Sequence, residues 1–203
     1  MKKYAVLHEP GDIVTLAGTR FVVLDVERRG SLPDSLFLLA LEPVGTSEFG
    51  SSNNYAESDL KKAVDKWLED MDKRGLDNAK LIPREIDLTT LDGSGCYGKL
   101  SVKAAPLTLD EAREYADIIP NAERWCWLAT GWSGPSKSDG DLALYVTSSG
   151  DWGGGGCSYS YGIRPALKAP SILFEDSEAG LDLSKIPTDD LLQEIHRRLA
   201  EKA

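Results

Sequence analysis

One stretch of the chain, residues 125 to 167, is dense in both bulky aromatic rings and glycine. It holds four of the five Trp, three of the seven Tyr and nine of the 19 Gly. Rings supply large apolar contact areas, whereas glycine has no side chain to pack and costs backbone entropy to order. We therefore expect this stretch to combine strands that pack in the core with a loop that displays rings to solvent.

The pattern within the stretch indicates where each part lies. Residues 142 to 147 alternate apolar with smaller or polar side chains, as a half-buried strand does, and residues 159 to 163 alternate in the same way. Pro165 limits the second strand. Between the strands, Gly153–Gly156 predict an exposed turn or loop. Trp125 and Trp127, which lie close to apolar neighbours, are expected in the core.

Several motifs outside and inside this stretch share spacings with a known family. They are Gly11-Asp12 with Gly18, Ser58 with Leu60, Trp67-Leu68, Trp127-Leu128 with Thr130, and the continuous run from Tyr161 to Leu167. Together, over roughly residues 10 to 168, they resemble a bacterial and phage family of unknown function whose domains are similar to C-type lectins. The last motif, seven residues in a row, is the most specific.

The resemblance implies a fold and two kinds of activity. Members of this fold group include variable receptors that are diversified by retroelements in phages and bacteria, and formylglycine-generating enzymes are more distant relatives. The implied fold is α+β and C-type-lectin-like, with two helices on a small twisted antiparallel sheet. The chain departs from the family motif at Cys126 and Ala129, where a Trp and an Arg are usual. Arg164 is expected to be structural and to hold a loop through its guanidinium donors.

Composition limits the partners. A chain of 203 residues can bury one good core, and a formal charge of −10 with a pI near 4.7 argues against binding a nucleic-acid backbone. We expect no membrane insertion, because no apolar run is long enough to span a bilayer. The first residues lack the apolar core of a signal peptide, so we expect a cytoplasmic or virion-associated protein. Three cysteines, an odd number, predict free thiols.

Elsewhere the sequence predicts ordinary elements. Residues 13 to 26 read as a hairpin, and the apolar run 36 to 41 as a strand buried on both faces. Ser58 is expected to cap a helix that Gly75 closes. Thr108 and Glu111 form a capping box for a helix over about 109 to 118.

The C-terminal part differs in character. Residues 1 to 168 are expected to form the ligand-binding domain, and residues 169 to 203 a connector followed by an amphipathic helix. That helix carries an apolar stripe of Leu191, Leu192, Ile195 and Leu199. A short helix with such a stripe is marginal alone, so it should dock either on its own domain or on a second subunit, which would give a homo-oligomer.

Residues suited to catalysis or metal binding are few. The two histidines, His8 and His196, lie near the chain ends, which disfavours a Ser/His or Cys/His nucleophile pair. Asp139, Asp141 and Asp151 suit a calcium ion, although aspartate beside glycine is more often turn chemistry. We expect no metal and no cofactor. An enzyme like the formylglycine-generating relatives, using Cys126 and Cys157, stays the alternative, as does a purely structural virion component.

The function expected from the sequence is non-catalytic binding of a protein or glycan on a cell surface. The family resemblance implies that such a receptor is phage- or prophage-encoded and diversified by a retroelement. Trp, Tyr, Ser and Gly are the residues of adaptable binding surfaces. The binding loops are 131 to 141 and 152 to 160. Their candidate ligand-binding residues are Trp132, Ser133, Ser136, Lys137, Asp139, Trp152, Cys157, Ser158 and Tyr159.

Overall fold

The computed structural model describes residues 8–29 and 32–174, together with residues 188 and 192. Apart from residues 188 and 192, the predicted C-terminal helix, with its apolar stripe, therefore lies outside the described residues. The predicted domain boundary at Lys168 falls inside a strand, because the last strand runs to Pro170 and is followed by a short 3-10 helix, η3, over Ser171–Phe174. Phe174 is buried and its ring meets that of His8 edge to face, so the described start of the connector packs on the domain.

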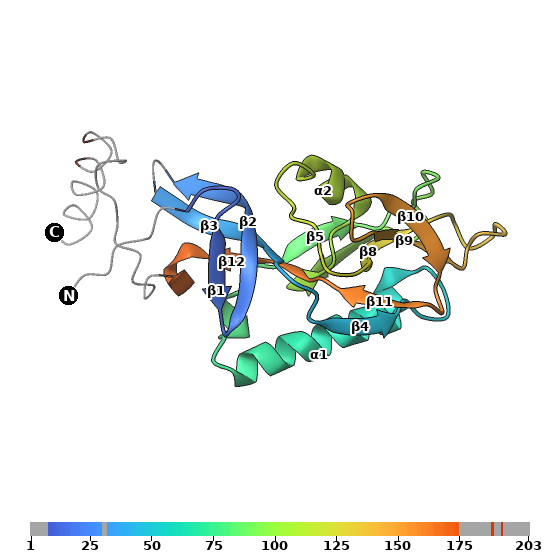
Figure 1. Ribbon diagram of the computed structural model, residues 1–203, viewed down its shortest axis with the longest axis horizontal. Coiled ribbons are helices and arrows are strands. Elements are labelled where there is room, and N and C mark those ends of the chain that lie inside the picture. The colour runs from blue at the N-terminus through green and yellow to red at the C-terminus, as the bar shows by residue number, and fades with distance from the viewer. Residues whose placement is uncertain (1–7, 30–31, 175–187, 189–191, 193–203) are drawn as a thin grey trace.

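Strands dominate the described residues, with twelve strands in three sheets and two α-helices (Figure 1). The first sheet has the order β1-β2-β3-β12-β7, the second β10-β9-β8-β11-β4, and the third pairs β5 with β6. The bounds are β1 Ile13–Leu16, β2 Thr19–Arg29, β3 Leu32–Ala40, β4 Gly45–Glu48, β5 Arg84–Asp87, β6 Lys99–Val102, β7 Ala104–Ala105, β8 Cys126–Gly131, β9 Leu142–Val146, β10 Trp152–Gly156, β11 Ser160–Ile163 and β12 Ala166–Pro170. The helices are α1 Asp59–Lys73 and α2 Leu109–Glu114, with short 3-10 helices η1 Tyr55–Glu57 and η2 Asn78–Lys80.

The predicted fold class is therefore wrong. We expected an α+β, C-type-lectin-like domain with two helices on one small sheet, whereas the protein is mainly β with three sheets. Sequence patterns missed β4, β10 and most of the β5-β6 pair, because these four- and five-residue strands are polar or glycine-rich and are held by their neighbours. Pairing and packing, more than intrinsic preference, decide strand formation at such positions.

Several local predictions are confirmed. The hairpin forms as β1 and β2, and Ser58 caps α1 by accepting a hydrogen bond from the Lys61 amide at 2.9 Å. The capping box of Thr108 and Glu111 is present, although α2 is shorter than expected and ends at Glu114. In each case neighbouring residues alone supply the signal.

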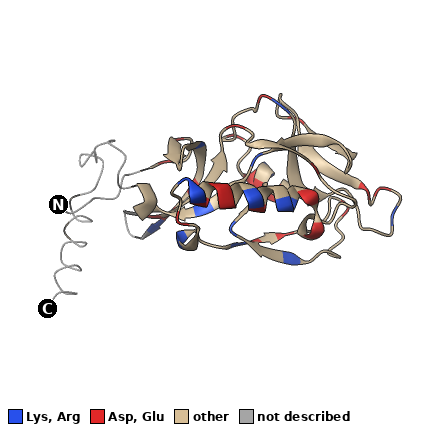
Figure 2. Ribbon diagram, turned by 90° about the horizontal axis from the view of Figure 1, so that it is seen from below, with Lys and Arg blue, Asp and Glu red and all other residues tan. Residues whose placement is uncertain are grey.

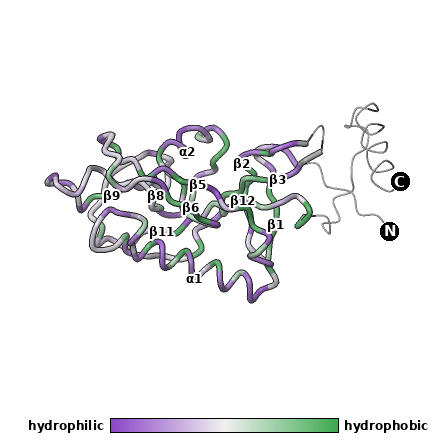
Figure 3. The backbone as a smooth tube through the Cα atoms, turned by 180° about the vertical axis from the view of Figure 1, so that it is seen from behind, coloured by the Kyte–Doolittle hydropathy of each residue, from purple (hydrophilic) through white to green (hydrophobic). Residues whose placement is uncertain are grey.

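Two hydrophobic cores lie on opposite sides of the strands, and each one joins the first sheet to the second. In β2, Phe21 and Val23 pack in one core with α1, while Val22 and Leu24 pack in the other with α2. Figure 1 shows α1 running beneath both sheets and α2 on the opposite side. The charged residues of α1 lie along its ribbon in Figure 2, and Figure 3 shows the strands from behind, coloured by hydropathy. The two sheets are thus held as one unit.

A two-stranded ribbon carries the chain between the sheets. β3 pairs with β12 in the first sheet, and β4 pairs with β11 in the second. At the crossing, Arg164 is buried and donates to three carbonyl oxygens: those of Ala40 through Nε at 2.8 Å, Pro120 through Nη1 at 3.0 Å and Leu41 through Nη2 at 3.1 Å. This confirms the structural role predicted for Arg164.

We expect Arg164→Lys to lower the free energy of unfolding by about 1–3 kcal/mol, because one ammonium cannot satisfy three buried carbonyls in this geometry. Urea unfolding measures the change. The control is Arg124→Lys at an exposed position nearby. Equal stabilities of the two variants would contradict the role of Arg164.

Candidate functional site

The stretch rich in rings and glycine, residues 125 to 167, builds most of the second sheet. It supplies β8, β9, β10 and β11, which are four of the five strands of that sheet. None of these four strands contains a charged residue. The candidate site therefore lies on a paired sheet, and the prediction of a wide glycine loop is wrong.

The glycine run is the edge strand β10, which pairs antiparallel with β9 from Trp152 opposite Val146 to Gly156 opposite Leu142. Its glycines make room for rings. A Cβ on Gly153 would come within 2.6 Å of the Tyr145 hydroxyl oxygen, and a Cβ on Gly154 within 2.3 Å of the Trp132 ring. On Gly155 it would meet the rings of Tyr145 and Tyr161 at 3.2 Å. Side chains alternate between the faces of a strand, so rings cover both faces of β10.

One face of the second sheet carries a continuous aromatic cluster, defined here as Trp125, Trp127, Tyr145, Tyr159 and Tyr161. The rings of Trp125 and Tyr145 are stacked, with centroids 4.9 Å apart and planes 8° from parallel. Tyr161 lies 5.0 Å from Tyr145 and 4.5 Å from Trp127. Such offset and edge contacts hold the rings in fixed positions relative to one another.

The aromatic cluster extends from the core to the surface. Trp127 is 1% exposed and packs against Phe49, and its indole Nε1 donates to the Ser47 carbonyl at 2.9 Å. At the other end Trp125 is 42% exposed and Tyr159 58% exposed. The prediction that Trp127 is in the core is confirmed, whereas the same prediction for Trp125 is wrong. Trp125 lies outside β8 and stacks on the outer face of Tyr145 rather than in the interior.

Within the loop 131 to 141, the predicted ligand-binding residues differ in exposure. Trp132 is partly buried over Gly154, and Ser133 is buried. The buried Asn53 fixes this loop by donating through Nδ2 to the carbonyls of Ser133 at 2.8 Å and Leu142 at 3.0 Å. Ser136, Lys137 and Asp139 are exposed. Only these last three offer side chains to solvent in full.

A surface ion pair ties the tip of this loop to a neighbouring turn. Lys137 Nζ lies 2.6 Å from the Asp92 carboxylate. That ammonium, with the hydroxyl of Thr90, holds the pKa of the Asp92 carboxyl well below its usual range. Lys137 is thus held in place, and a ligand would have to compete with Asp92 for its charge.

The remaining candidates, in the segment 152 to 160, divide between the two faces of the sheet. Tyr159 contacts Tyr161 in the aromatic cluster, and Ser158 beside it is exposed. Trp152, 42% exposed, is paired with Val146 on the opposite face, where the Arg113 guanidinium lies 5.4 Å from its ring centroid. The predicted residues therefore do not form one patch.

A cavity of about 110 Å³ lies beside Trp152. Its lining is mostly apolar and comes from α2, the segment after it and the sheet, with Ala112, Ile119, Cys126, Val146 and Trp152 among the residues. Arg164 also lines this cavity, but its Nε, Nη1 and Nη2 atoms already donate to the three backbone carbonyls described above. The cavity can accept a small apolar group.

Cys157 and Cys126 are buried thiols. Burial raises the pKa of Cys157 to about 12 and that of Cys126 to about 11. A nucleophilic cysteine needs the opposite, a lowered pKa and an open approach. All three cysteines are free, and Cys96 alone is exposed.

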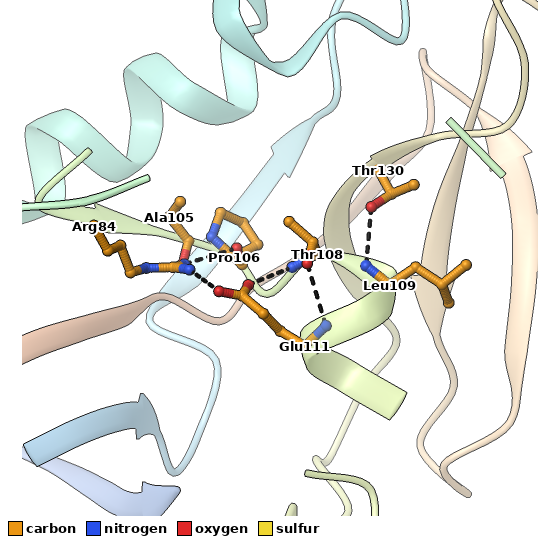
Figure 4. Close-up of polar contacts among 7 residues, drawn as sticks. All are labelled: Arg84, Ala105, Pro106, Thr108, Leu109, Glu111 and Thr130. Atoms are coloured by element: carbon orange, nitrogen blue, oxygen red, sulfur yellow. Dashed lines mark hydrogen bonds and ion pairs between the residues drawn. The ribbon is translucent and has the colours of Figure 1, made fainter. Parts of the chain in front are cut away.

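The sequence did not predict a polar cluster that is centred on Arg84. The guanidinium forms an ion pair with Glu111 and donates to the carbonyls of Ala105 at 3.1 Å and Pro106 at 3.3 Å (Figure 4). Glu111 also completes the capping box of α2. An open cavity of about 240 Å³ borders this pair and includes Tyr115, whose pKa burial raises to about 12. Arg84 is nearly buried and already paired, which fits a role in joining α2 to the β5-β6 sheet.

Asp139, Asp141 and Asp151 do not form a cation site, since the described residues contain no group of three or more His, Cys, Asp or Glu side chains arranged to hold a metal ion. Among the described helices none is both long and apolar enough to cross a membrane.

Comparisons of the chain with protein-family models, with curated proteins and with solved structures give no match. The geometry of the site is thus the basis for the function.

The fit of rings over β10 predicts a difference between two glycine substitutions. Gly154→Ala should lower the free energy of unfolding by about 1–3 kcal/mol, because the new methyl group overlaps the Trp132 ring. Gly156→Ala should change it by less than about 1 kcal/mol, because nothing lies closer than 3.7 Å to a Cβ there. Chemical denaturation compares the two, and equal losses would contradict the packing described.

Thiol labelling tests the cysteine environments. At pH 8 we expect one thiol, Cys96, to react rapidly with a disulfide reagent in the folded protein, and three to react in denaturant. The raised pKa values leave Cys126 and Cys157 protonated at this pH, and their burial blocks access. Rapid labelling of Cys157 in the folded protein, located by mass spectrometry, would contradict this and favour an enzyme.

Proposed function

We propose that the protein is a non-catalytic binding module that holds its ligand against the exposed end of the aromatic cluster. The observation that carries the proposal is the joint exposure of Trp125 and Tyr159 on a sheet whose other rings fix them. Tyr and Trp are the residues most enriched where binding energy concentrates, since they combine a large apolar area with a polar atom. A rigid display lowers the entropy that must be lost on binding.

The surroundings of the aromatic cluster support binding over catalysis. Tyr145 and Tyr161 are half-buried beneath the exposed rings, and β8 to β11 contribute no charged group to this face. A tyrosine hydroxyl is neutral at physiological pH, and burial raises the pKa of Tyr161 further. Neutral hydroxyls and ring faces suit a glycan or a protein segment as ligand, and we propose a ligand of this kind on a cell surface.

The loops predicted from the sequence contribute at the margin of this surface. Ser158 is exposed beside Tyr159, whereas Ser133 and Cys157 are buried and do not reach a ligand. The buried thiols are the reason that the proposal involves no covalent chemistry. Trp125, Tyr145 and Tyr161, absent from the predicted binding residues, take the central place.

The proposal predicts that Trp125→Ala combined with Tyr159→Ala weakens binding by about 10- to 100-fold, as loss of two anchoring rings does at other interfaces. Labelled protein is applied to glycan and peptide arrays, and the affinity for the strongest hit is then measured by calorimetry. The matched control is Ile13→Ser, which removes an exposed apolar side chain, 50% exposed, from β1 in the first sheet. Equal losses in the control and the double variant would contradict the proposal.

A further inference from the structure

The outer edge of β10 has unpaired backbone groups. β10 is the end strand of its sheet, next to β9 alone. The hydrogen bonds that flank the pair run from the Thr147 amide to the Asp151 carbonyl and from the Cys157 amide to the Asp141 carbonyl. Because such bonds alternate along an antiparallel pair, Gly153 and Gly155 bond to β9, while residues 152, 154 and 156 point their amides outward. Among the described residues none bonds to these three amides.

This edge has none of the usual protection against strand pairing. Lysine, proline, inward charges and bulges normally block an edge strand. β10 has the sequence WGGGG, and its register with β9 is unbroken. Glycine side chains cannot cover the backbone, and the rings of Trp132, Tyr145 and Tyr161 that pack on its two faces leave the edge between them. An incoming strand therefore meets the unpaired amides of residues 152, 154 and 156, whereas the Gly156 carbonyl already accepts from the Tyr159 amide at 2.9 Å.

The two faces beside the edge differ in a way that suits alternating side chains. On one side lie Tyr145 and Tyr161 of the aromatic cluster, and on the other lie Trp132, Trp152 and the cavity of about 110 Å³. Successive side chains of an added strand point to opposite faces. Apolar side chains of such a strand would thus lie beside Tyr145 and Tyr161 on one face and beside Trp132 and Trp152 on the other.

The ends of β10 carry acidic groups. Asp151 immediately precedes the strand, Asp141 lies opposite Cys157, the residue that follows it, and both aspartate side chains are exposed. With a formal charge of −10 for the chain, these carboxylates favour a partner with basic flanks. They disfavour pairing of β10 with β10 of a second copy, because antiparallel pairing would bring Asp151 of one copy toward Asp141 of the other.

We infer that the partner is an extended peptide segment that adds to β10 as a sixth strand of the second sheet, with apolar side chains at its centre and Lys or Arg at its ends. In this mode backbone hydrogen bonds supply affinity and the pockets on either face select the side chains. The inference rests on the proposed function and names the class of ligand. Trp125 and Tyr159 would then contact the part of the partner that lies over the aromatic cluster.

The test uses the full chain and a library of ten-residue peptides with alternating Val, Tyr and Thr centres and Lys at both ends. We expect a member to bind and to slow hydrogen exchange at the amides of Gly154 and Gly156 at least tenfold. The amides of Gly153 and Gly155, already bonded to β9, should change little. Exchange is followed by NMR with and without the peptide.

A pair of variants isolates the backbone contact. Gly156→Pro removes one outward amide at an edge position that proline tolerates, whereas Gly156→Ala keeps that amide. We expect the proline variant to bind the peptide at least tenfold more weakly than the alanine variant, with equal thermal stability of the two free proteins. If the two free variants differ in stability, the hydrogen-exchange measurement on the unmodified chain decides whether the peptide adds to β10 as a strand.

The other outcomes separate the two proposals. A peptide that binds without slowing exchange at Gly154 and Gly156, but is lost with Trp125 and Tyr159, overturns strand addition and leaves the binding function standing. Binding of a glycan but of no peptide would likewise overturn strand addition and leave the binding function standing. A dimer that Gly156→Pro dissociates would show a second copy on the edge and overturn the peptide inference. Absence of any peptide or glycan ligand would overturn both proposals.

Discussion

The candidate site depends on the missing side chains of Gly153, Gly154 and Gly155. A larger residue at Gly153 or Gly154 would collide with the ring of Tyr145 or Trp132, and one at Gly155 would press on the rings of Tyr145 and Tyr161. The glycines therefore allow rings to lie directly on an edge strand, on both of its faces, and Trp125 then stacks on Tyr145 at the surface. Glycine costs conformational entropy in a strand, and the packing of rings against its backbone offsets that cost.

The rest of the fold holds this sheet in place. The ribbon formed by β3, β4, β11 and β12 runs through both large sheets, and the buried Arg164 ties its crossing to the segment that follows α2. Two cores, one with α1 and one with α2, press on the strands from opposite sides. The exposed rings are consequently attached to a sheet that contributes to both cores, which suits a surface that binds without rearranging.

The sequence predicted those elements whose signal lies in adjacent residues. Ser58 and the pair of Thr108 and Glu111 mark helix starts, and the alternation in residues 13 to 26 marks the hairpin. The fold class was wrong because β4 and β10 have no strand signal of their own and form only when β11 and β9 lie beside them. Trp125 and Trp127 are two residues apart with similar neighbours, so sequence alone could not tell that one is buried and the other exposed. Tyr145 and Tyr161 stood in the predicted strands, and their two-residue alternation was the available signal for the aromatic cluster.

One sheet carries an aromatic surface, an apolar cavity and an unprotected strand edge. Each of these features is useful for binding, and none requires chemistry at a reactive group. The most direct measurement is a crystal structure of the protein with the strongest ligand found on the arrays. The account predicts that the ligand contacts Trp125 and Tyr159 and lies along or beside β10. A ligand bound instead on the first sheet, or in the cavity of about 240 Å³ beside Tyr115, would contradict it.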